Sequence, residues 1–528
     1  MSDRAGWPLV VLVLVLAAGA VALPDLFDLD AFKLSVVALL SAAILLPWMA
    51  WRGRAELAAW LSSPGGLLYL ASVAWSLPRA LGALGHSAVT DRLLGVLLAC
   101  VAGALGVGAA RHARSALRDA LLAVGVVTAV VAALQAVGLE RWLTSGPDEI
   151  VALMGNTTRA GALLALCVTA AFAAVLCPDP AEPPWRPRIA AWVLTLGSAA
   201  LLLTRARGGW LAAACGLVAV ALVSRRGLAA QRRTWIAHLI FGVGLALILG
   251  DGPSRLLASK LDSDAPLLSG RDVTAQVRLS VWRGTLAMAG ERPLAGWGLG
   301  RFRERFPPWR DPAEAALPGL GGAPTEVDHP HQELLLALSE GGWPSALCLA
   351  AFVGATLLRA ARAARRPPAP DGGASERVAL GVLVAGTVAA LVQNAWVSPG
   401  TAVPFFAAAG WTWAPAALRA PGRAARVALV AGCLGAIAAL AALAVPRVRV
   451  QLGMREFYRR AAIADVTSET LPLLVRAADA DPGDVNAQRL LLFYGSKFLS
   501  KSPQAGEPLR APVERARERL ALLAPHSR

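Results

Sequence analysis

The chain has 528 residues, 56% of them hydrophobic and 16% charged, with a mean hydropathy of +0.55. These values exclude a soluble globular protein with an ordinary polar surface and indicate a polytopic membrane protein. The net charge of +16 does not indicate a nucleic-acid partner, because no basic stretch with interleaved aromatic residues lies in a soluble segment. The charge is instead a topology signal, since arginines gather in the short loops between apolar runs.

Apolar runs of about 20 residues recur along most of the chain, and each is long enough to cross the hydrocarbon core as a helix. A backbone in lipid must satisfy its own hydrogen bonds, which demands helices. We therefore expect an all-α fold with about 12–13 transmembrane helices. The expected spans are residues 8–24, 31–50, 63–78, 92–110, 117–138, 160–177, 188–204, 208–224, 235–250, 333–357, 378–397, 401–418 and 426–446.

The distribution of arginine predicts the orientation of these spans, because cytoplasmic loops carry the excess of basic residues. An N-terminus in the cytoplasm separates the loops into an arginine-rich and an arginine-poor class. The cytoplasmic loops would hold Arg52, Arg54, Arg111, Arg114, Arg118, Arg186, Arg188, Arg225, Arg226, Arg232, Arg233, Arg359, Arg362, Arg365, Arg366, Arg419 and Arg423. The short outer loops would hold only Arg79, Arg141, Arg205 and Arg207.

Two segments escape the membrane and would both lie outside. We expect helices 1–9 in residues 1–250, a long outer loop in 251–332, helices 10–13 in 333–446 and a helical tail in 447–528. In the tail, "LPLLVRAADADPGDVNAQRLLLFYGSKFL" places two helix-like patches around a Pro-Gly turn and resembles a tetratricopeptide hairpin. A partner-binding repeat and a solvated helical tail both remain open.

The end of the long loop, "EVDHPHQELLLALSEGG" (326–342), concentrates histidine beside an apolar run. Pro330 suits a first helical position, which would place His331 in the first turn of the following helix. A helix N-terminus lowers the pKa of a nearby imidazole and keeps it neutral, as a general base requires. The alternative is that His329 and His331 are ordinary interfacial loop residues.

Glu333 and Glu340 lie seven residues apart on this helix and would share one face. Glu333 would either orient His331 or complement the helix dipole as a first-turn carboxylate. Glu340 precedes the Gly-Gly-Trp-Pro sequence of 341–344, where the helix should kink within the depth of the lipid.

Four further arginines are predicted on the outer side and would form a basin for a polyanionic headgroup such as a pyrophosphate: Arg159, Arg205, Arg207 and Arg278. The alternative for each one is snorkelling at the interface. The Asp262-Ser263-Asp264 pattern is a weak metal-site signal, because three-residue patterns are common by chance. The "GWGLG" of 296–300 indicates a tight turn, since it lacks the strand context of a phosphate-binding loop.

Four motifs resemble the O-antigen ligase and polymerase superfamily, whose members act on undecaprenyl-pyrophosphate-linked glycans. "MGNTTRAGALLAL" resembles its GNxN-type outer turn, and "LLLTRARGGWLA" its leucine-rich span ending in S-R-G. "RLSVWRGTLAMAGERPLAGWGLGRF" resembles its R-x-x-x-W … P-x-x-G-x-G-x-x-F stretch, and "HPHQELLLALSEGG" its H-x-H-N-x-x-L-x-x-x-x-E-x-G. The resemblance covers roughly residues 150–350, and its last two motifs are the more specific.

The resemblance implies that His331 activates the acceptor hydroxyl and that Arg207 and Arg278 hold the pyrophosphate. It also implies an inverting reaction that needs no metal and no cofactor, with undecaprenyl pyrophosphate as leaving group. Two positions depart from the family pattern. Gln332 replaces an Asn, which would loosen a substrate hydrogen bond, and Ala206 replaces a Ser, which removes a hydroxyl.

The sequence therefore predicts a glycosyltransferase of the bacterial inner membrane with its site on the outer face. Its partners would be membrane lipids, a lipid-linked glycan donor and an acceptor, with a possible protein partner at the tail. Ligation onto a lipid A core is the first hypothesis, polymerisation of O-antigen or exopolysaccharide units the second, and transfer to protein the third. A lipid or polysaccharide transporter is the alternative from another class, and it should carry charges within its spans, which here are nearly free of them.

Overall fold

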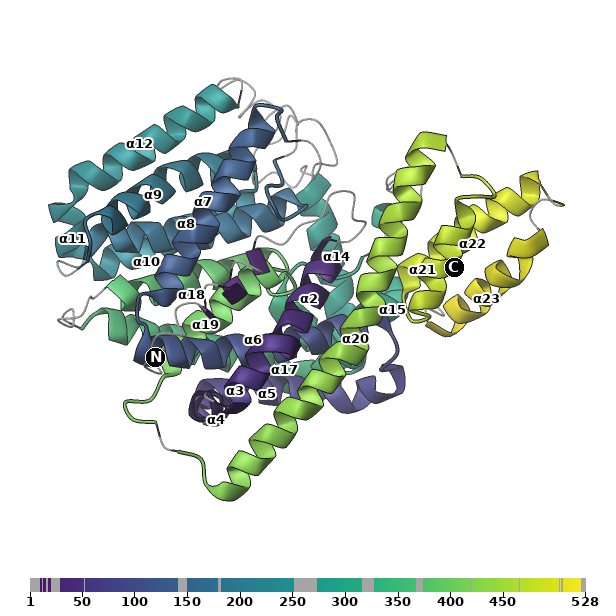
Figure 1. Cartoon of the computed structure of the whole chain (residues 1–528), viewed down its shortest axis with the longest axis horizontal. Coiled ribbons are helices and arrows are strands. Elements are labelled where there is room, and N and C mark those ends of the chain that lie inside the picture. Colours follow the sequence, from purple (N-terminus) through teal and green to yellow (C-terminus); the bar gives the residue numbers. More distant parts are fainter. Residues whose placement is uncertain are drawn as a thin grey trace.

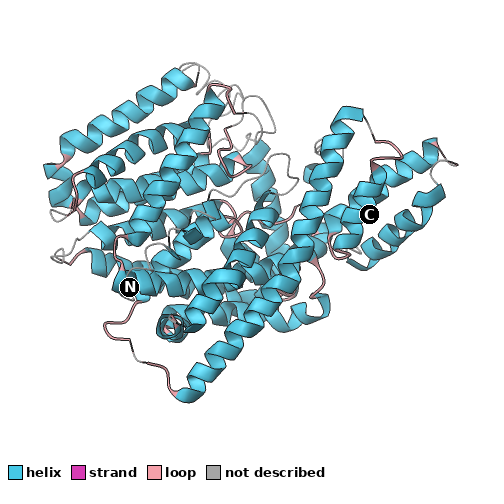
Figure 2. Cartoon of the chain, viewed as in Figure 1, coloured by secondary structure: helices cyan, strands magenta, loops and turns pink. Residues whose placement is uncertain are grey.

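The computed structural model describes residues 10–11, 13–15, 18–19, 29–51, 53–140, 150–178, 182–250, 273–315, 327–366, 374–418, 420–464, 466–502, 504 and 507–523. Within these ranges every regular element is a helix and no strand occurs (Figure 2). The predicted all-α fold is thus confirmed for the described part of the chain. The Asp262-Ser263-Asp264 pattern and most of the first expected span, residues 8–24, lie outside it.

The helices of the first half are α2 (Leu29–Leu40), α3 (Leu46–Trp51), α4 (Arg54–Ser62), α5 (Pro64–Ser76), α6 (Ser87–His112), α7 (Ala116–Ala136), α8 (Thr157–Leu176), α9 (Trp185–Leu203), α10 (Arg207–Val223), α11 (Arg225–Ala230) and α12 (Arg232–Leu249). Those of the second half are α14 (Val273–Glu291), α15 (Phe302–Arg305), α16 (Pro312–Ala315), α17 (Glu333–Ala364), α18 (Ala374–Val392), α19 (Pro399–Trp413), α20 (Arg423–Ala464), α21 (Leu471–Ala480), α22 (Val485–Lys501) and α23 (Glu507–Leu523). Shorter turns, η1 (Ser41–Leu45), η2 (Leu77–Ala83) and η3 (Pro307–Trp309), connect or extend them.

Eight helices in the described residues are long and apolar enough to cross a membrane, and the pair Arg54–Ser62 and Pro64–Ala83, bent by 69°, makes a ninth if it is one span. The chain is therefore a multi-pass membrane protein. The number is below the expected 12–13 for identifiable reasons: α10 has 17 residues, α19 has 15, and α9 begins with two arginines in its first turn. Several expected spans thus correspond to helices shorter or more polar than a full membrane crossing needs.

Small residues bring the central helices close together. A Cβ on Gly410 of α19 would lie 1.8 Å from the Gly103 carbonyl oxygen of α6, and one on Gly209 of α10 would lie 2.7 Å from the Gly161 backbone of α8. Close packing of this kind holds helices together in lipid, where the hydrophobic effect does not drive their association. α8 is the most enclosed candidate span, with 94% of its apolar window buried, and it lies within the block of α7 to α12 at one side of Figure 1.

Helix α17 is broken where the sequence predicted a kink. Gly342 has φ 68° and ψ −169°, and Pro344 follows two residues later. The 293–298 segment covers the break: Trp297 N donates to Ser339 O at 2.9 Å, Gly298 N to Glu340 O at 2.8 Å, and Trp343 N donates to Pro293 O at 2.7 Å. The "GWGLG" sequence is the tight turn that was expected, with positive φ at its three glycines, and it hydrogen-bonds the backbone exposed by the kink.

Helix α20 runs diagonally across the molecule, and α21, α22 and α23 pack on its far part, away from α7–α12 (Figure 1). It continues through Pro446 to Ala464, so the expected boundary at residue 447 falls inside one helix. The two patches expected around the Pro-Gly turn are α21 and α22. Their cluster of buried side chains also includes Met454 and Phe457 of α20, so the tail has its own core, which is built on the end of a helix that continues from the membrane part.

Candidate functional site

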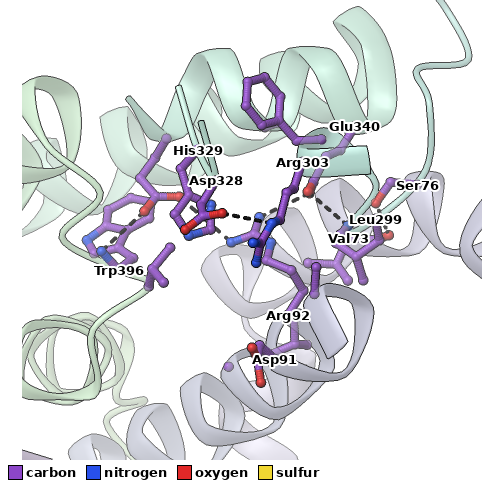
Figure 3. Close-up of a pocket in the computed structure, with 18 of the residues that line it drawn as sticks. Val73, Ser76, Asp91, Arg92, Leu299, Arg303, Asp328, His329, Glu340 and Trp396 are labelled. Carbon is purple, nitrogen blue, oxygen red and sulfur yellow. Dashed lines mark hydrogen bonds and ion pairs between the residues drawn. The ribbon is translucent and has the colours of Figure 1, made fainter. Parts of the chain in front are cut away.

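A cavity of about 160 Å³ lies where α6, α8, α15, α17, α20 and α22 meet (Figure 3). It contains four of the residues that the sequence singled out: Arg159, His329, Glu333 and Glu340. Its other charged or amide-bearing lining residues are Asp91, Arg92, Arg303, Asp328, Arg447 and Asn486. Segments more than 300 positions apart in the chain thus enclose one polar space, which is the best candidate for a functional site.

Arg92 of α6 holds the two glutamates of α17. Its Nη1 lies 3.9 Å from Glu333 Oε2 and its Nη2 lies 3.3 Å from Glu340 Oε2. Glu333 also accepts a hydrogen bond from Trp396 N at 3.2 Å, and Glu340 accepts one from Gly300 N at 2.8 Å. The expectation that both glutamates share one helix face is confirmed. Within the described residues Glu333 binds Arg92 and Trp396, so the proposed orientation of His331 by Glu333 stays a prediction.

The histidine segment does not begin the helix as expected. Gln332 is the N-cap of α17, and its Oε1 accepts a hydrogen bond from Leu335 N. His331 therefore precedes the cap, with φ 54°, and Pro330 does not occupy the first helical position. The prediction was wrong because the helix is capped by a glutamine, which is not a preferred N-cap residue, and begins three residues later than the Pro signal indicated.

His331 is in a strained conformation. A non-glycine residue at positive φ costs about 1–3 kcal/mol and persists where surrounding contacts impose it. Three such residues occur in the described chain, Ala152, Arg205 and His331, and two of them were singled out as site residues. On either side of His331, Trp282 Nε1 donates to Pro330 O at 2.7 Å and the Gln332 side chain caps α17, which fixes the turn.

The environment keeps both imidazoles neutral. Burial and the cations of Arg278 and Arg159 lower the pKa of His331 to about 4. Burial lowers the pKa of His329 well below its ordinary value, and His331, Arg92, Arg159 and Arg303 act in the same direction. At neutral pH His331 thus carries no proton on one ring nitrogen, and that nitrogen can accept one.

Arg278, which acts on His331, belongs to α14. This helix is fixed to α15 and α17 by a cluster of buried apolar residues: Val281, Met288, Phe302, Phe306 and Leu336. Arg159 arrives from α8, whose first turn is capped by Asn156, with Oδ1 accepting from Thr158 N at 2.8 Å and Arg159 N at 3.3 Å. The expected turn at "MGNTT" leading into a helix is confirmed, while its place on the outer side stays a prediction.

Arg205 and Arg207 lie at the start of α10, beside α8, but do not line the cavity. The start of α10 packs on α8, since a Cβ on Gly161 would lie 2.5 Å from Ala206 Cβ. Ala206 is the N-cap of α10 and provides no side-chain cap, so the hydroxyl missing relative to the family pattern is also missing at a helix terminus. At the other departure from that pattern, the Gln332 oxygen is used to cap α17.

Sequence reasoning missed the cations and carboxylates that complete the cavity. Asp91, Arg92 and Arg447 lie inside candidate membrane spans, so the spans are less free of charge than expected. The signal was present in "VTDRLL", where two charges enter an apolar run and should have indicated a site. Arg303 is the third residue after the "GWGLG" turn and belongs to no motif of its own.

Two buried amides near Arg207 also escaped notice. Gln393 is 3% exposed, and within the described residues neither of its amide atoms has a hydrogen-bond partner. The same holds for the amide atoms of Asn394. Gln393 Oε1 lies 3.0 Å from where a Cβ on Gly208 would be. Buried amides are normally satisfied, so this pair indicates a place for a polar ligand group.

The arrangement combines a neutral imidazole, cations beside it, and carboxylates held by Arg92. This set of groups can accept a proton from a hydroxyl and can stabilise an anionic leaving group. In comparisons with known proteins, residues 189–350 match the family model described as O-antigen ligase. That range contains Arg205, Arg207, Arg278, His331 and Glu340 and excludes Arg92 and Arg159. No curated protein matches the chain.

Proposed function

From the O-antigen ligase domain at residues 189–350, which supports membership of the O-antigen ligase family, we propose that this protein transfers a glycan from undecaprenyl pyrophosphate to an acceptor hydroxyl. The match to this domain supports a membrane glycosyltransferase of the ligase and polymerase type. The donor, the acceptor and the side of the membrane are the proposal.

The single observation that carries the proposal is the setting of His331, whose pKa is lowered to about 4 and on which the cations Arg278 and Arg159 act. A base for a sugar hydroxyl must be unprotonated, and a pyrophosphate leaving group must meet positive charge. Both requirements are met within one turn of the chain and the two helices next to it.

In the proposed reaction the acceptor oxygen attacks the anomeric carbon of the donor glycan. The C–O bond to the pyrophosphate breaks, and its electron pair leaves with undecaprenyl pyrophosphate, so the anomeric centre inverts. The acceptor proton passes to His331. Arg278 and Arg159 bind the pyrophosphate, assisted by Arg207 and Arg205 at the start of α10, while His329, Glu333 and Glu340 support the histidine turn. No metal or cofactor takes part in this scheme.

We place the site on the outer face of the bacterial inner membrane because the arginine-rich loops would then lie in the cytoplasm. Ligation onto a lipid A core is the first form of the proposal. The tail, which is unusual for a minimal ligase, favours polymerisation or protein glycosylation, because it adds an extramembrane surface beside the site.

A transporter of lipid or polysaccharide is the second candidate, and one observation favours it. The broken helix α17 and the buried Arg92–Glu333–Glu340 group at its first half are features that transporters use to bind substrates. The His331→Ala variant separates the two, since a transporter that still folds should tolerate it, whereas loss of a general base should lower the rate about 10²–10⁴-fold.

The test is glycan transfer by the purified protein from a synthetic undecaprenyl-pyrophosphate oligosaccharide in the presence of EDTA. We expect the wild type to release undecaprenyl pyrophosphate and the His331→Ala and Arg278→Ala variants to fail while remaining folded. Product size then distinguishes single ligation from polymerisation. Full activity of His331→Ala, or a requirement for a divalent metal, contradicts the mechanism.

A further inference from the structure

The turn between α21 and α22 lies against the membrane part of the chain, at the edge of the cavity. Ser87 N, at the start of α6, donates to Gly483 O at 3.1 Å. A Cβ on Gly483 would lie 1.6 Å from Gly85 O, so no other residue fits there without displacing the backbone. The tail is therefore in direct contact with the helix that contributes Asp91 and Arg92.

A buried arginine fixes this contact. Arg447 of α20 has a side chain that is 5% exposed, with Nη2 2.7 Å from Asp91 Oδ2 and Nε 3.1 Å from Asp91 Oδ1. Its Nη1 also binds Asp484, the N-cap of α22, and lies 3.8 Å from Asp481 Oδ2. One guanidinium thus joins α6, α20 and the turn before α22, and these ion pairs fix the position of the tail relative to the cavity.

Asn486, in the first turn of α22, is a lining residue of the cavity. Arg303 lies between it and the histidine segment: Arg303 Nε binds Asp328 Oδ1 at 2.9 Å, and Arg303 Nη2 binds Asn486 Oδ1. Figure 3 shows Arg303 and Asp328 pointing toward one another beside His329. Within the described residues the Asn486 amide nitrogen has no hydrogen-bond acceptor, so it can donate a hydrogen bond to a ligand.

The cations that act on the two histidines share one residue. Arg278 acts on His331, Arg92 and Arg303 act on His329, and Arg159 acts on both. Arg278 and Arg159 are the cations proposed to bind the donor pyrophosphate. Arg92 and Arg303 are bound to carboxylates, and Arg303 is also bound to the tail, so these two residues stand beside hydrogen-bond acceptors.

We propose that the α21–α22 turn forms the acceptor side of the cavity and that Asn486 is a specificity-determining residue for a saccharide acceptor. This rests on the proposed function. An amide N–H₂ and the Asp328 carboxylate, held on either side of one guanidinium, match neighbouring sugar hydroxyls, each of which donates and accepts a hydrogen bond. A Ser or Thr side chain of a peptide has a single hydroxyl, which would bind only one of these two groups.

The test compares Asn486→Asp and Asn486→Ala with wild type in the full-length protein, with saturating undecaprenyl-pyrophosphate oligosaccharide and a varied saccharide acceptor. Asn486→Asp retains the oxygen that binds Arg303 but removes the amide donor. We expect both variants to raise the acceptor KM about 3- to 10-fold, with the donor KM unchanged. Gln504→Ala, which removes an exposed amide of the tail away from the cavity, serves as the control.

The outcomes separate this inference from the proposed function. Wild-type protein that transfers no glycan contradicts the proposed function, and the acceptor assignment falls with it. Transfer with an unchanged acceptor KM in both variants overturns the role of Asn486 alone. A wild-type acceptor KM in Asn486→Asp, with a defect only in Asn486→Ala, shows that Asn486 merely docks the tail. Transfer only to Ser or Thr peptides overturns the saccharide assignment.

Discussion

Asp91 and Arg92 are consecutive residues of α6, but their side chains bind two different parts of the molecule. Arg92 binds Glu333 and Glu340 of α17, while Asp91 binds Arg447 of α20. Helix α17, which follows the histidine segment, and helix α20, which leads to the tail, are thus fixed to neighbouring positions of α6. A displacement of the tail would therefore move Asp91 through Arg447, and the neighbouring Arg92 would move relative to Glu333 and Glu340.

Replacing Arg92 with Met should destabilise the protein by about 3 kcal/mol. Glu333 and Glu340 have side chains 4% and 3% exposed, and they would lose their shared cation. The Arg92 side chain is 24% exposed, which places the effect at the lower end of that seen for buried pairs. Thermal denaturation in detergent measures the change in stability.

The double variant Arg92→Met/Glu340→Gln provides the control, because it removes one of the two uncompensated charges. It should recover part of the lost stability, and a double-variant cycle gives the coupling energy. Additive effects of the two single substitutions would show that the pairs seen here contribute nothing to the folded state.

Local features of the sequence were enough to predict the regions around the site. The Gly-Gly-Trp-Pro sequence after Glu340 predicted the kink of α17, and the three glycines of 296–300 predicted a tight turn, because both depend on backbone conformation within a few residues. The start of α17 was predicted at residue 333 from the apolar run, yet the cap was misread, since Gln332 is not a usual N-cap.

What the sequence could not supply is the pairing across long separations. Arg92 meets Glu340 at a distance of 248 positions, and Arg447 meets Asp91 at 356. No periodicity or spacing rule relates such residues, because their meeting depends on how α6, α17 and α20 pack. The sequence accordingly predicts a helical tail but no residue of it at the site, whereas Asn486 lines the cavity.

The pH dependence of transfer should report the pKa of His331. The active form is neutral, so protonation abolishes activity, and with a pKa of about 4 the wild type should lose kcat/KM only as the pH falls through about 4. Arg278→Gln removes a cation that lowers this pKa. Its acid limb should therefore move to higher pH, toward the ordinary value of 6.5.

Arg283→Gln is the matched control for that profile, because Arg283 is an exposed residue on the same helix, α14. Its acid limb should coincide with that of the wild type. The profile is obtained from kcat/KM at subsaturating donor between about pH 3.5 and 8. An unchanged acid limb in Arg278→Gln would show that another group, and not His331, limits the reaction at low pH.

Gly342→Ala should disrupt the kink of α17. At φ 68° and ψ −169° the backbone is in a region essentially restricted to glycine, and a Cβ there would lie 2.4 Å from Pro293 O. We expect a loss of more than about 1–3 kcal/mol and of transfer activity, because the 296–300 turn and Glu340 would be displaced. In Gly354→Ala, on the same helix, nothing lies within 4 Å of the added Cβ. That variant should keep full activity, and equal damage in both would assign the effect to helix flexibility in general.

Gln393→Met should stabilise the free protein but weaken donor binding. The wild-type amide is 3% exposed and has no hydrogen-bond partner in the described residues, an arrangement that costs about 1–3 kcal/mol. An apolar side chain of similar volume removes that cost, so the melting temperature should rise while the donor KM increases.

In the control variant Gln135→Met the melting temperature should fall, because Gln135 Oε1 accepts from Ala152 N at 2.7 Å and Nε2 donates to Ala152 O at 3.2 Å. A fall in melting temperature for both variants would show that Gln393 serves the fold. A rise in melting temperature for Gln393→Met together with an unchanged donor KM would show that the Gln393 amide does not bind the donor.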